Sequence, residues 1–351
     1  MFQSTEPQVA NTPLRAVGEP GLSRNFALTR TPFRISFFGG GTDYPRWYLQ
    51  EEEGAVLSTT INKYAYVGCG LGTAPAWTEA FAPGLNEVRS TVGSACLSHL
   101  GFSNFADARV FHREDLPIRS GIGSSSSFIV GLVRAAAELR GISLSPSDLA
   151  FAAIEIEQNV LNQNVGSQDQ VAAAYGGLNF IRFCQDGRIC VNRLDITAER
   201  AASLEDRLML FYTHTSRSSS EIAGNVISNI PNHRIDLRIM RQAVDAGIAV
   251  LSGVGELDPL GELLHESWMI KRALSPLVSN PMIDSIYETA LAHGALGGKL
   301  LGAGAGGFML FYVPPEYQEA VKSALKPNLY VPFRFESRGS SLLSAPDNPA
   351  R

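Results

Sequence analysis

The sequence predicts a two-domain protein of the α+β class, and three observations support this prediction. The chain has 351 residues, a length that favours two domains over one. Its residues are 45% hydrophobic and 18% charged, which is enough apolar material for a buried core. Segments typical of strands alternate with segments typical of helices along most of the chain.

The two ends of the chain carry scattered Pro, Gly, Ser and Thr without an apolar period, which is typical of flexible tails. We therefore expect tails at residues 1–23 and 340–351. Between them we place an N-terminal domain at residues 24–205 and a C-terminal domain at residues 206–339.

Strands are predicted in the first domain from β-branched and aromatic residues. Residues 34–38 form a β-prone run that stops at Gly39, and residues 55–67 are long enough for one or two strands. Helical periodicity then extends from residue 124 to residue 140.

A second helix is predicted to begin at Ser145 and Pro146, because Ser suits the N-cap and Pro the first helical position. Its expected apolar stripe comprises Leu149, Ala153, Ile156 and Val160. Further on, a charged helix around residues 196–207 leads into an apolar strand at residues 208–212. The remaining predicted elements are helices at residues 235–253, 256–274 and 280–293 and a strand at residues 308–313.

Composition excludes several classes of function. The formal net charge of -5 argues against a nucleic-acid-binding protein, which would carry a basic surplus. The four cysteines show no metal-ligand spacing and are typical of reduced thiols in a cytoplasmic protein. We expect no signal peptide and no membrane span, because no uncharged apolar run is long enough.

A glycine- and serine-rich segment precedes the helix that starts at residue 124. Glycines let the backbone approach a ligand, and the start of a helix offers N–H groups and a positive dipole end to an anion. The segment lacks the Lys of a Walker A loop, and a flexible linker is the alternative. The residues predicted to bind the phosphates of a nucleotide are Pro117, Ser120, Gly121, Ile122, Gly123, Ser124, Ser125, Ser126 and Ser127.

An earlier glycine run ends the strand at residues 34–38 and is followed by a carboxylate. This pattern suits a backbone pressed against a ligand, with Asp43 accepting hydrogen bonds from sugar hydroxyls. A tight turn with a capping Asp is the alternative. The predicted substrate-binding residues are Gly40, Gly41, Thr42 and Asp43.

A third glycine-rich segment covers residues 297–308 and precedes a strand. A Rossmann dinucleotide site would follow a strand instead, so this order counts against one. Small residues alternate densely enough to bring the backbone close to a substrate, at Gly302, Gly304 and Gly306.

Taken in order, the three loops resemble the signature motifs of the GHMP kinases, which transfer the γ-phosphoryl group of ATP to a hydroxyl. The resemblance covers residues 25 to 337, and its departures are small: Ile122 stands where Leu is commoner, and Ala303 and Ala305 interrupt the third run. It implies a nucleotide-binding domain with a left-handed βαβ unit and a ferredoxin-like C-terminal domain.

Four stretches resemble the GHMP kinases that act on heptose 7-phosphates, namely residues 34–43, 57–64, 166–170 and 294–302. This resemblance implies phosphorylation of the anomeric C1 hydroxyl of D-glycero-D-manno-heptose 7-phosphate, on the route to a nucleotide-activated heptose. The expected partners are ATP and a sugar phosphate, with a homodimer left open.

Catalytic residues follow from the same resemblance. Asp169 matches the catalytic aspartate and is expected to act as the general base. Arg34 matches a basic residue that faces this carboxylate, where a cation favours its ionised form and stabilises the transferred phosphoryl group.

The family pairs a serine with a glutamate to hold Mg²⁺, and these map to Ser125 and Glu157. Glu155 is the competing ligand. On an ideal helix Glu157 lies roughly 70° and Glu155 roughly 130° from the centre of the apolar stripe, so Glu157 turns inward more easily.

A substrate that already carries a phosphate needs basic residues. Lys63, Arg217 and Lys271 are favoured because they lie in family-like stretches, with Arg272 and Lys299 as further candidates. Two alternatives remain open: a kinase for a free sugar, similar to an L-fucokinase, and a sugar sensor that binds ATP without turnover.

Overall fold

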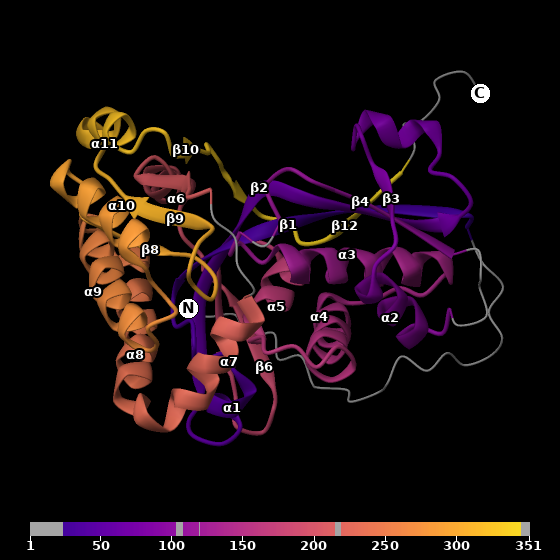
Figure 1. Ribbon diagram of the computed structural model, residues 1–351, viewed down its shortest axis with the longest axis horizontal. Helices are drawn as coiled ribbons and strands as arrows, with labels where there is room; N and C mark the ends of the chain where they lie inside the picture. The colour runs from indigo at the N-terminus through magenta and orange to yellow at the C-terminus, as the bar shows by residue number, and fades with distance from the viewer. Residues whose placement is uncertain (1–23, 103–107, 119, 215–218, 345–351) are drawn as a thin grey trace.

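A computed structural model of the chain describes residues 24–102, 108–118, 120–214 and 219–344. In these ranges the protein contains two antiparallel sheets, one of eight strands and one of four. The larger sheet and its helices occupy one side of the molecule, and the smaller sheet with its helices occupies the other (Figure 1). The predicted α+β class is confirmed.

The first sheet is organised around two long antiparallel strands, β1 (Phe26–Phe38) and β2 (Gly54–Leu71). The strand predicted at residues 34–38 is thus the end of β1, and residues 55–67 belong to a single strand. The other strands of this sheet are β3 (Asn86–Val88), β4 (Ala108–Glu114), β5 (Asn179–Phe183), β6 (Ile189–Arg193), β11 (Phe335–Glu336) and β12 (Ser341–Leu343).

Strands β4 and β5 both pair with β2 in antiparallel fashion, β4 along residues 65–71 and β5 along residues 54–58. They therefore run parallel to each other, and the connection between them is helical. This is the βαβ unit that the family resemblance implies, and its left-handedness stays a prediction. The connecting helices are α3 (Ser124–Leu139), α4 (Pro146–Glu155), the π-helical turn Ile156–Val160 and α5 (Gln168–Tyr175).

Helix α3 lies directly on β1. A Cβ added at Gly131 would come within 2.9 Å of Thr31 Oγ1, so only glycine allows this close approach. Thr29 Oγ1 also donates a hydrogen bond to the Gly131 carbonyl oxygen at 3.1 Å. The helix is thereby held in place on the sheet, and its N-terminus at Ser124 has a fixed position.

Helix α4 begins at the predicted cap, where Ser145 Oγ accepts from the Asp148 N–H at 3.1 Å. It ends at Glu155 and continues as a π-helical turn, closed by a Leu161 N–H to Ile156 carbonyl bond of 2.9 Å. The prediction that Val160 continues the buried stripe is wrong. Val160 is exposed, because a residue inserted into the helical turn changes the face on which later residues lie.

The second sheet has the strand order β10-β7-β9-β8, with all pairs antiparallel. In chain order these are its fourth, first, third and second strands, and helices separate the first from the second and the third from the fourth, as in a ferredoxin-like domain. Its strands are β7 (Leu208–Tyr212), β8 (Gly297–Leu300), β9 (Phe308–Tyr312) and β10 (Leu329–Tyr330). The helices in and beside it are α6 (Ala198–Glu205), α7 (Ser219–Asn229), α8 (Arg234–Ser252), α9 (Pro259–Ala273), α10 (Pro281–Ala292) and α11 (Gln318–Ala324).

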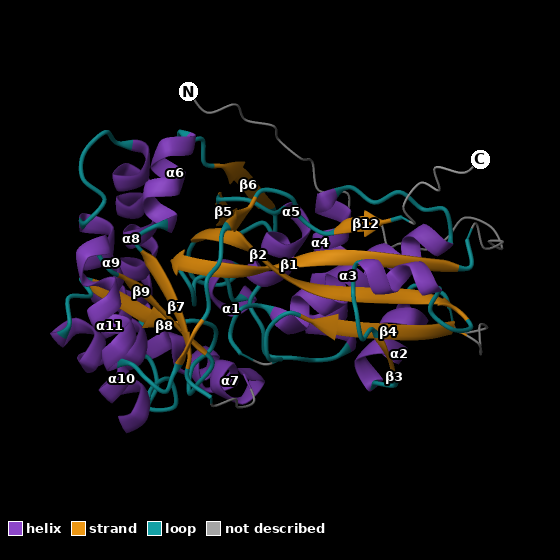
Figure 2. Cartoon of the chain, turned by 90° about the horizontal axis from the view of Figure 1, so that it is seen from above, coloured by secondary structure: helices purple, strands orange, loops and turns teal. Residues whose placement is uncertain are grey.

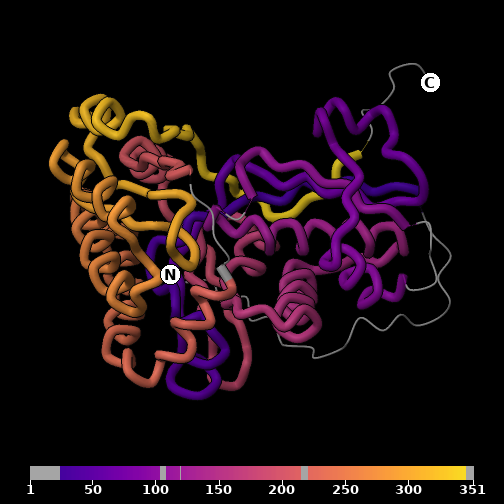
Figure 3. The backbone as a smooth tube through the Cα atoms, in the orientation of Figure 1, coloured from indigo at the N-terminus to yellow at the C-terminus, as the bar shows by residue number. Residues whose placement is uncertain are grey.

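The C-terminal segment returns from the second sheet to the first, where the yellow end of the trace runs beside the indigo strands in Figure 3. Strand β12 pairs with β1, and β11 pairs with β2. The prediction of a tail from residue 340 is therefore wrong for residues 341–343, which complete the sheet by hydrogen bonding. We propose that the domain boundary lies at residues 205/206 and that β11 and β12, although they follow the second domain in the chain, belong to the first domain.

Two short helices complete the first domain, α1 (Pro45–Tyr48) and α2 (Thr91–His99). Helix α8 joins the two parts of the protein, because a Cβ at its Gly247 would come within 2.6 Å of the Phe38 ring on β1. The buried apolar side chains of the two sheets thus belong to one continuous core. Figure 2 shows β7, β8 and β9 near one end of the long strands β1 and β2. Among the residues that the structure describes, none of the helices combines the length and apolarity that a membrane crossing requires.

Candidate active site

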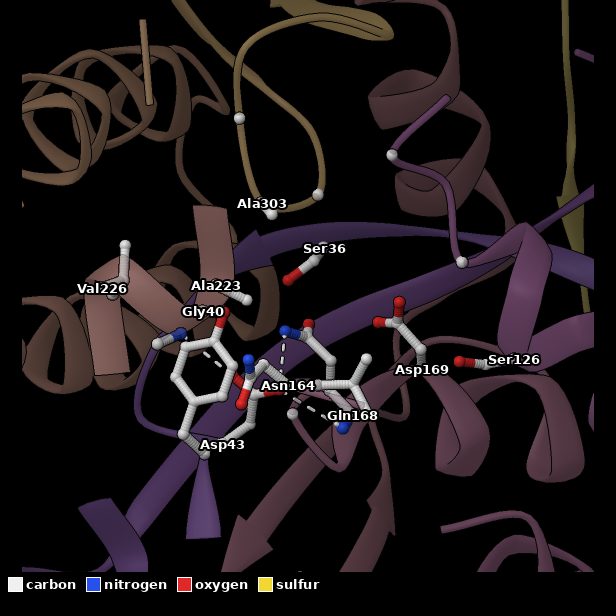
Figure 4. Close-up of a pocket in the computed structure, with 18 of the residues that line it drawn as sticks. Ser36, Gly40, Asp43, Ser126, Asn164, Gln168, Asp169, Ala223, Val226 and Ala303 are labelled. Atoms are coloured by element: carbon white, nitrogen blue, oxygen red, sulfur yellow. Dashed lines mark hydrogen bonds between the residues drawn. The ribbon is translucent and has the colours of Figure 1, made fainter. Parts of the chain in front are cut away.

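A cavity lies where the two sheets meet, at the N-terminus of α3 (Figure 4). All three glycine-rich loops contribute to its walls, together with residues of α5, α7 and α9. The lining includes Arg34, Ser36, Gly40, Gly41, Asp43, Tyr44, Gly121, Gly123, Ser124, Ser125, Ser126, Glu157, Asn164, Gln168, Asp169, Ala223, Val226, Lys271, Lys299, Gly302, Ala303, Gly304 and Gly306.

Of the nine residues predicted to bind the phosphates, five line the cavity and four do not. Gly121 and Gly123 have φ values of 81° and 77°, a conformation that glycine adopts easily, and Gly123 is the N-cap of α3. The first N–H groups of the helix therefore face the cavity, where an anion would be stabilised. The other four do not line the cavity. Pro117 is exposed, and its carbonyl accepts a hydrogen bond from Ser120 Oγ. The Ile122 carbonyl accepts from the Arg34 N–H (3.1 Å), and Ser127 Oγ donates to the Pro32 carbonyl (3.0 Å), so these residues hold the loop in place.

The third glycine loop packs directly on the phosphate loop. A Cβ at Gly302 would lie 2.5 Å from the Gly121 Cα, and one at Gly307 would lie 2.2 Å from the Ser120 carbonyl oxygen. Phe308 N–H also donates to the Ser120 carbonyl at 3.0 Å. The glycines of this loop therefore serve the contact between two backbones, as well as lining the cavity.

Arg34 and Asp169 form a two-pronged ion pair beside the helix N-terminus. Arg34 Nε donates to Asp169 Oδ1 and Nη2 donates to Oδ2, each at 2.8 Å. The Arg34 side chain is almost fully buried, whereas Asp169 keeps about a quarter of its side-chain surface exposed toward the cavity. A Cβ at Gly123 would lie 3.4 Å from Asp169 Oδ2, so this carboxylate adjoins the start of α3.

Glu157 is fully buried, with 0% of its surface exposed, while Glu155 is exposed. Its carboxylate accepts hydrogen bonds from Ser126 Oγ (2.7 Å), Ser125 Oγ (3.3 Å) and Gln170 Nε2. Burial raises the pKa of Glu157 to about 7, and nearby Asp169 adds to this effect. Among the residues that the structure describes, this carboxylate forms no ion pair and is held by hydrogen bonds from neutral groups.

Asp43 is buried in the cavity wall beside Gln168. Its Oδ1 accepts from the Gly41 N–H at 2.9 Å and its Oδ2 from Gln168 Nε2 at 3.0 Å. Burial, and secondarily the charge of Asp169, raise the pKa of Asp43. The neighbouring Thr42 does not line the cavity, because its hydroxyl bonds the Gly39 and Ala55 carbonyls at 2.8 and 3.0 Å.

Two lysines from the second domain reach the cavity. Lys271 Nζ donates to the carbonyls of Leu300 (2.8 Å) and Gly302 (2.6 Å), and Lys299 Nζ donates to that of Phe37 (2.8 Å). Burial lowers the pKa of both lysines, that of Lys299 to about 7, and the charge of Arg34 adds to this effect.

The other basic candidates are placed elsewhere. Lys63 is half-buried on β2 and does not line the cavity, and Arg272 lies 3.4 Å from Asp284 outside it. Arg217 lies outside the described residues.

The lining residues that the sequence did not predict include Ser36, Tyr44, Asn164 and Gln168. Gln168 and Gln170 flank Asp169 in the stretch 166–170, and this position in the sequence was the only indication that they belong to the site. Ser36 carried none, because a serine in a buried strand is more often structural.

Comparison with known proteins identifies the family. The family model for the GHMP kinases N terminal domain matches residues 88–177, and that for the GHMP kinases C terminal matches residues 245–331. The chain belongs to the GHMP kinases. It is a sugar kinase, a phosphotransferase with a hydroxyl acceptor, and kinases of this family use ATP.

Two relatives and one solved structure show which kinases this chain is similar to. The chain is 32% identical over 333 residues to the D-glycero-alpha-D-manno-heptose 7-phosphate kinase of Campylobacter jejuni, across 89% of this chain and 97% of the relative. It is 25% identical over 311 residues to the bifunctional fucokinase/GDP-fucose pyrophosphorylase of Arabidopsis thaliana, across 80% of this chain and 29% of the relative. A solved D-glycero-D-manno-heptose 1-phosphate kinase from Bacteroides thetaiotaomicron has the same fold, with a TM-score of 0.70, 23% identity, and coverage of 91% of this chain and 99% of that one.

Proposed function

We propose that this kinase transfers the γ-phosphoryl group of ATP to the C1 hydroxyl of D-glycero-D-manno-heptose 7-phosphate, giving the 1,7-bisphosphate and ADP. The proposal draws on the relative from Campylobacter jejuni, which matches this chain over nearly its whole length. The observation that carries it is the Arg34–Asp169 pair beside the N-terminus of α3.

In this proposal the triphosphate of ATP binds at the start of α3, where backbone N–H groups and the helix dipole favour anions. The sugar lies on the other side of Asp169, toward Asp43. The C1 oxygen attacks the γ-phosphorus, the hydroxyl proton moves to the Asp169 carboxylate, and the bond between the γ-phosphorus and the bridging oxygen breaks to release ADP.

Arg34 has two roles here. It holds both oxygens of Asp169, so the base keeps one orientation, and each oxygen still has a lone pair for the incoming proton. Its positive charge also lies beside the place where the transferred phosphoryl group passes, where it would stabilise the developing negative charge.

The residues present fit a magnesium ion. Glu157 and Ser125 offer hard oxygen ligands on the cavity wall, and no cationic side chain of the described residues pairs with the buried Glu157 carboxylate. We propose that these two residues hold Mg²⁺, which when bound would neutralise charge on the phosphates. Ser126 and Gln170 fix the orientation of Glu157 by hydrogen bonds.

A kinase for a free sugar is the second candidate, favoured by the similarity to the fucokinase of Arabidopsis thaliana. Two basic side chains on the cavity wall besides Arg34, namely Lys271 and Lys299, argue instead for a substrate that brings its own negative charge.

An ADP-release screen of sugars and sugar phosphates, including heptose 7-phosphates, tests the proposal. Phosphorus NMR of the product should show the new ester at C1. Equal or better turnover of free fucose than of heptose 7-phosphate would favour the second candidate.

A further inference from the structure

Ser36 is a buried hydroxyl without a partner on the cavity wall. It lies on β1 between Arg34 and the end of the strand, and only 5% of its surface is exposed. Within the described part of the chain, its Oγ has no hydrogen-bond partner. Figure 4 shows this oxygen pointing into the cavity. A buried polar group normally finds a partner, so this one is expected to meet a ligand.

The two lysines of the second domain add further donors to the same cavity. In its charged form, which a bound anion favours, each lysine side chain has three N–H donors. Lys271 uses two of them on backbone carbonyls and Lys299 uses one. One donor of Lys271 and two of Lys299 are thus left without a hydrogen-bond acceptor in the described ranges, and both side chains line the cavity.

These donors differ in kind from the groups around Asp43. Asp43 and the Gln168 side-chain oxygen accept hydrogen bonds, as sugar hydroxyls require, and that oxygen has no partner among the described residues. Ser36, Lys271 and Lys299 supply hydrogen-bond donors and positive charge instead. In the view of Figure 4, Asp169 separates Ser126 of the phosphate loop from Ser36.

We propose that Ser36, Lys299 and Lys271 form an anion site that binds the phosphate monoester already present on the sugar substrate. The inference rests on the proposed function for the identity of the sugar. The site lies on the sugar side of Asp169, so its anion is distinct from the triphosphate at α3. A phosphate monoester has three acceptor oxygens and about two negative charges, which matches a hydroxyl and two ammonium groups.

The titration of the lysines is consistent with such a ligand. Burial lowers the pKa of both groups, although the charge of Asp43 acts in the opposite direction. An incoming phosphate would favour their charged forms. Lys299 also holds the Phe37 carbonyl of β1, and this bond places its ammonium group one residue from Ser36 along the strand.

The test uses Ser36→Ala and Lys299→Met in steady-state kinetics with heptose 7-phosphate, with the unphosphorylated heptose, and with ATP as the varied substrate. Both variants should lower kcat/KM for heptose 7-phosphate by about tenfold or more, the effect of losing a hydrogen bond to a charged group. The kcat/KM for free heptose and the KM for ATP should stay within about twofold. Equal losses for both sugars, or a raised KM for ATP alone, would overturn the site.

Ser58→Ala is the matched control. Ser58 pairs with Ser36 across β1 and β2, is 1% exposed, and also has a hydroxyl without a partner in the described ranges, but it does not line the cavity. It should behave as wild type with every substrate. If Lys299→Met fails to fold, as judged by thermal melting, Ser36→Ala decides the question alone.

A binding experiment separates this inference from the proposed function. Inorganic phosphate is titrated into the enzyme saturated with a non-hydrolysable ATP analogue, and heat release is measured. Binding to wild type and to Ser58→Ala, weakened about tenfold in Ser36→Ala, supports the site even if heptose 7-phosphate proves not to be a substrate. Absent binding, or equal binding to all variants, overturns the site even if heptose 7-phosphate is turned over.

Discussion

Arg34 holds both carboxylate oxygens of Asp169, with donor–acceptor distances of 2.8 Å each, although the two residues lie 135 positions apart in the chain. The same guanidinium donates through Nη1 to the carbonyl of Gly121 in the phosphate loop. One buried side chain of β1 therefore fixes the proposed base and the proposed nucleotide site relative to each other.

Replacement of Arg34 by Lys should weaken its contacts with both Asp169 and Gly121. An ammonium group cannot hold both oxygens of Asp169 and the Gly121 carbonyl in the same planar geometry. We expect kcat to fall by roughly 10²-fold and the free energy of unfolding to fall by about 1–3 kcal/mol. Stopped-time ADP assays and urea unfolding measure the two effects. The Arg182→Lys variant serves as control, because the half-buried Arg182 lies outside the cavity. A fully active Arg34→Lys enzyme would contradict the role given to the pair.

Gly302→Ala tests the contact between the glycine loops. The new Cβ would lie 2.5 Å from the Gly121 Cα, so the phosphate loop must move. We expect the KM for ATP to rise at least about fivefold and stability to fall by about 1–3 kcal/mol.

Gly84→Ala is its control, because Gly84 has a similar positive φ of 77° but open space around the added Cβ. It should lose stability through backbone strain alone and keep its KM for ATP. An unchanged KM for ATP in Gly302→Ala would show that the loop contact does not position the nucleotide.

Magnesium binding should depend on pH through Glu157. Its pKa is raised from 4.5 to about 7, so between these values the native protein holds a proton that the unfolded chain has lost. In the absence of metal, the contribution of Glu157 to stability therefore decreases as pH rises through this window. Magnesium competes with that proton, so its apparent affinity should increase roughly tenfold from pH 6 to pH 8.

Calorimetric titration of Mg²⁺ into the ATP-bound enzyme at several pH values measures this increase. Glu157→Gln should bind the ion weakly and without the pH dependence, whereas the exposed Glu155→Gln should match wild type. The opposite result for the two glutamates would transfer the metal site to Glu155.

Much of the fold was predictable because its elements carry local signals. The helix after the phosphate loop, the cap at Ser145 and the strand at residues 208–212 were predicted within one or two residues. Strand β12 was not, since the three residues Ser341–Leu343 are too few to show a strand period and become a strand only by pairing with β1. Its formation depends on a partner more than 300 positions away, which local pattern cannot reveal.

The residues of the candidate site were also predictable only in part. Asp169 was predicted from the family resemblance and Asp43 from the glycine run before it, and both line the cavity. Ideal helix geometry predicted that Glu157 would turn inward. In the structure Glu157 lies in a π-helical turn, which no local sequence pattern predicted. Ser36 was missed and Lys299 was passed over for Lys63, since only the folded chain shows which side chains reach the cavity.

The most direct test of the account is turnover and ATP binding in the same Asp169→Asn preparation. Asparagine keeps the size of the side chain but cannot accept the hydroxyl proton as a carboxylate does. The account predicts a loss of about 10³-fold or more in kcat, with the dissociation constant for ATP within about threefold of wild type. Full turnover in this variant would contradict the central claim that Asp169 is the base.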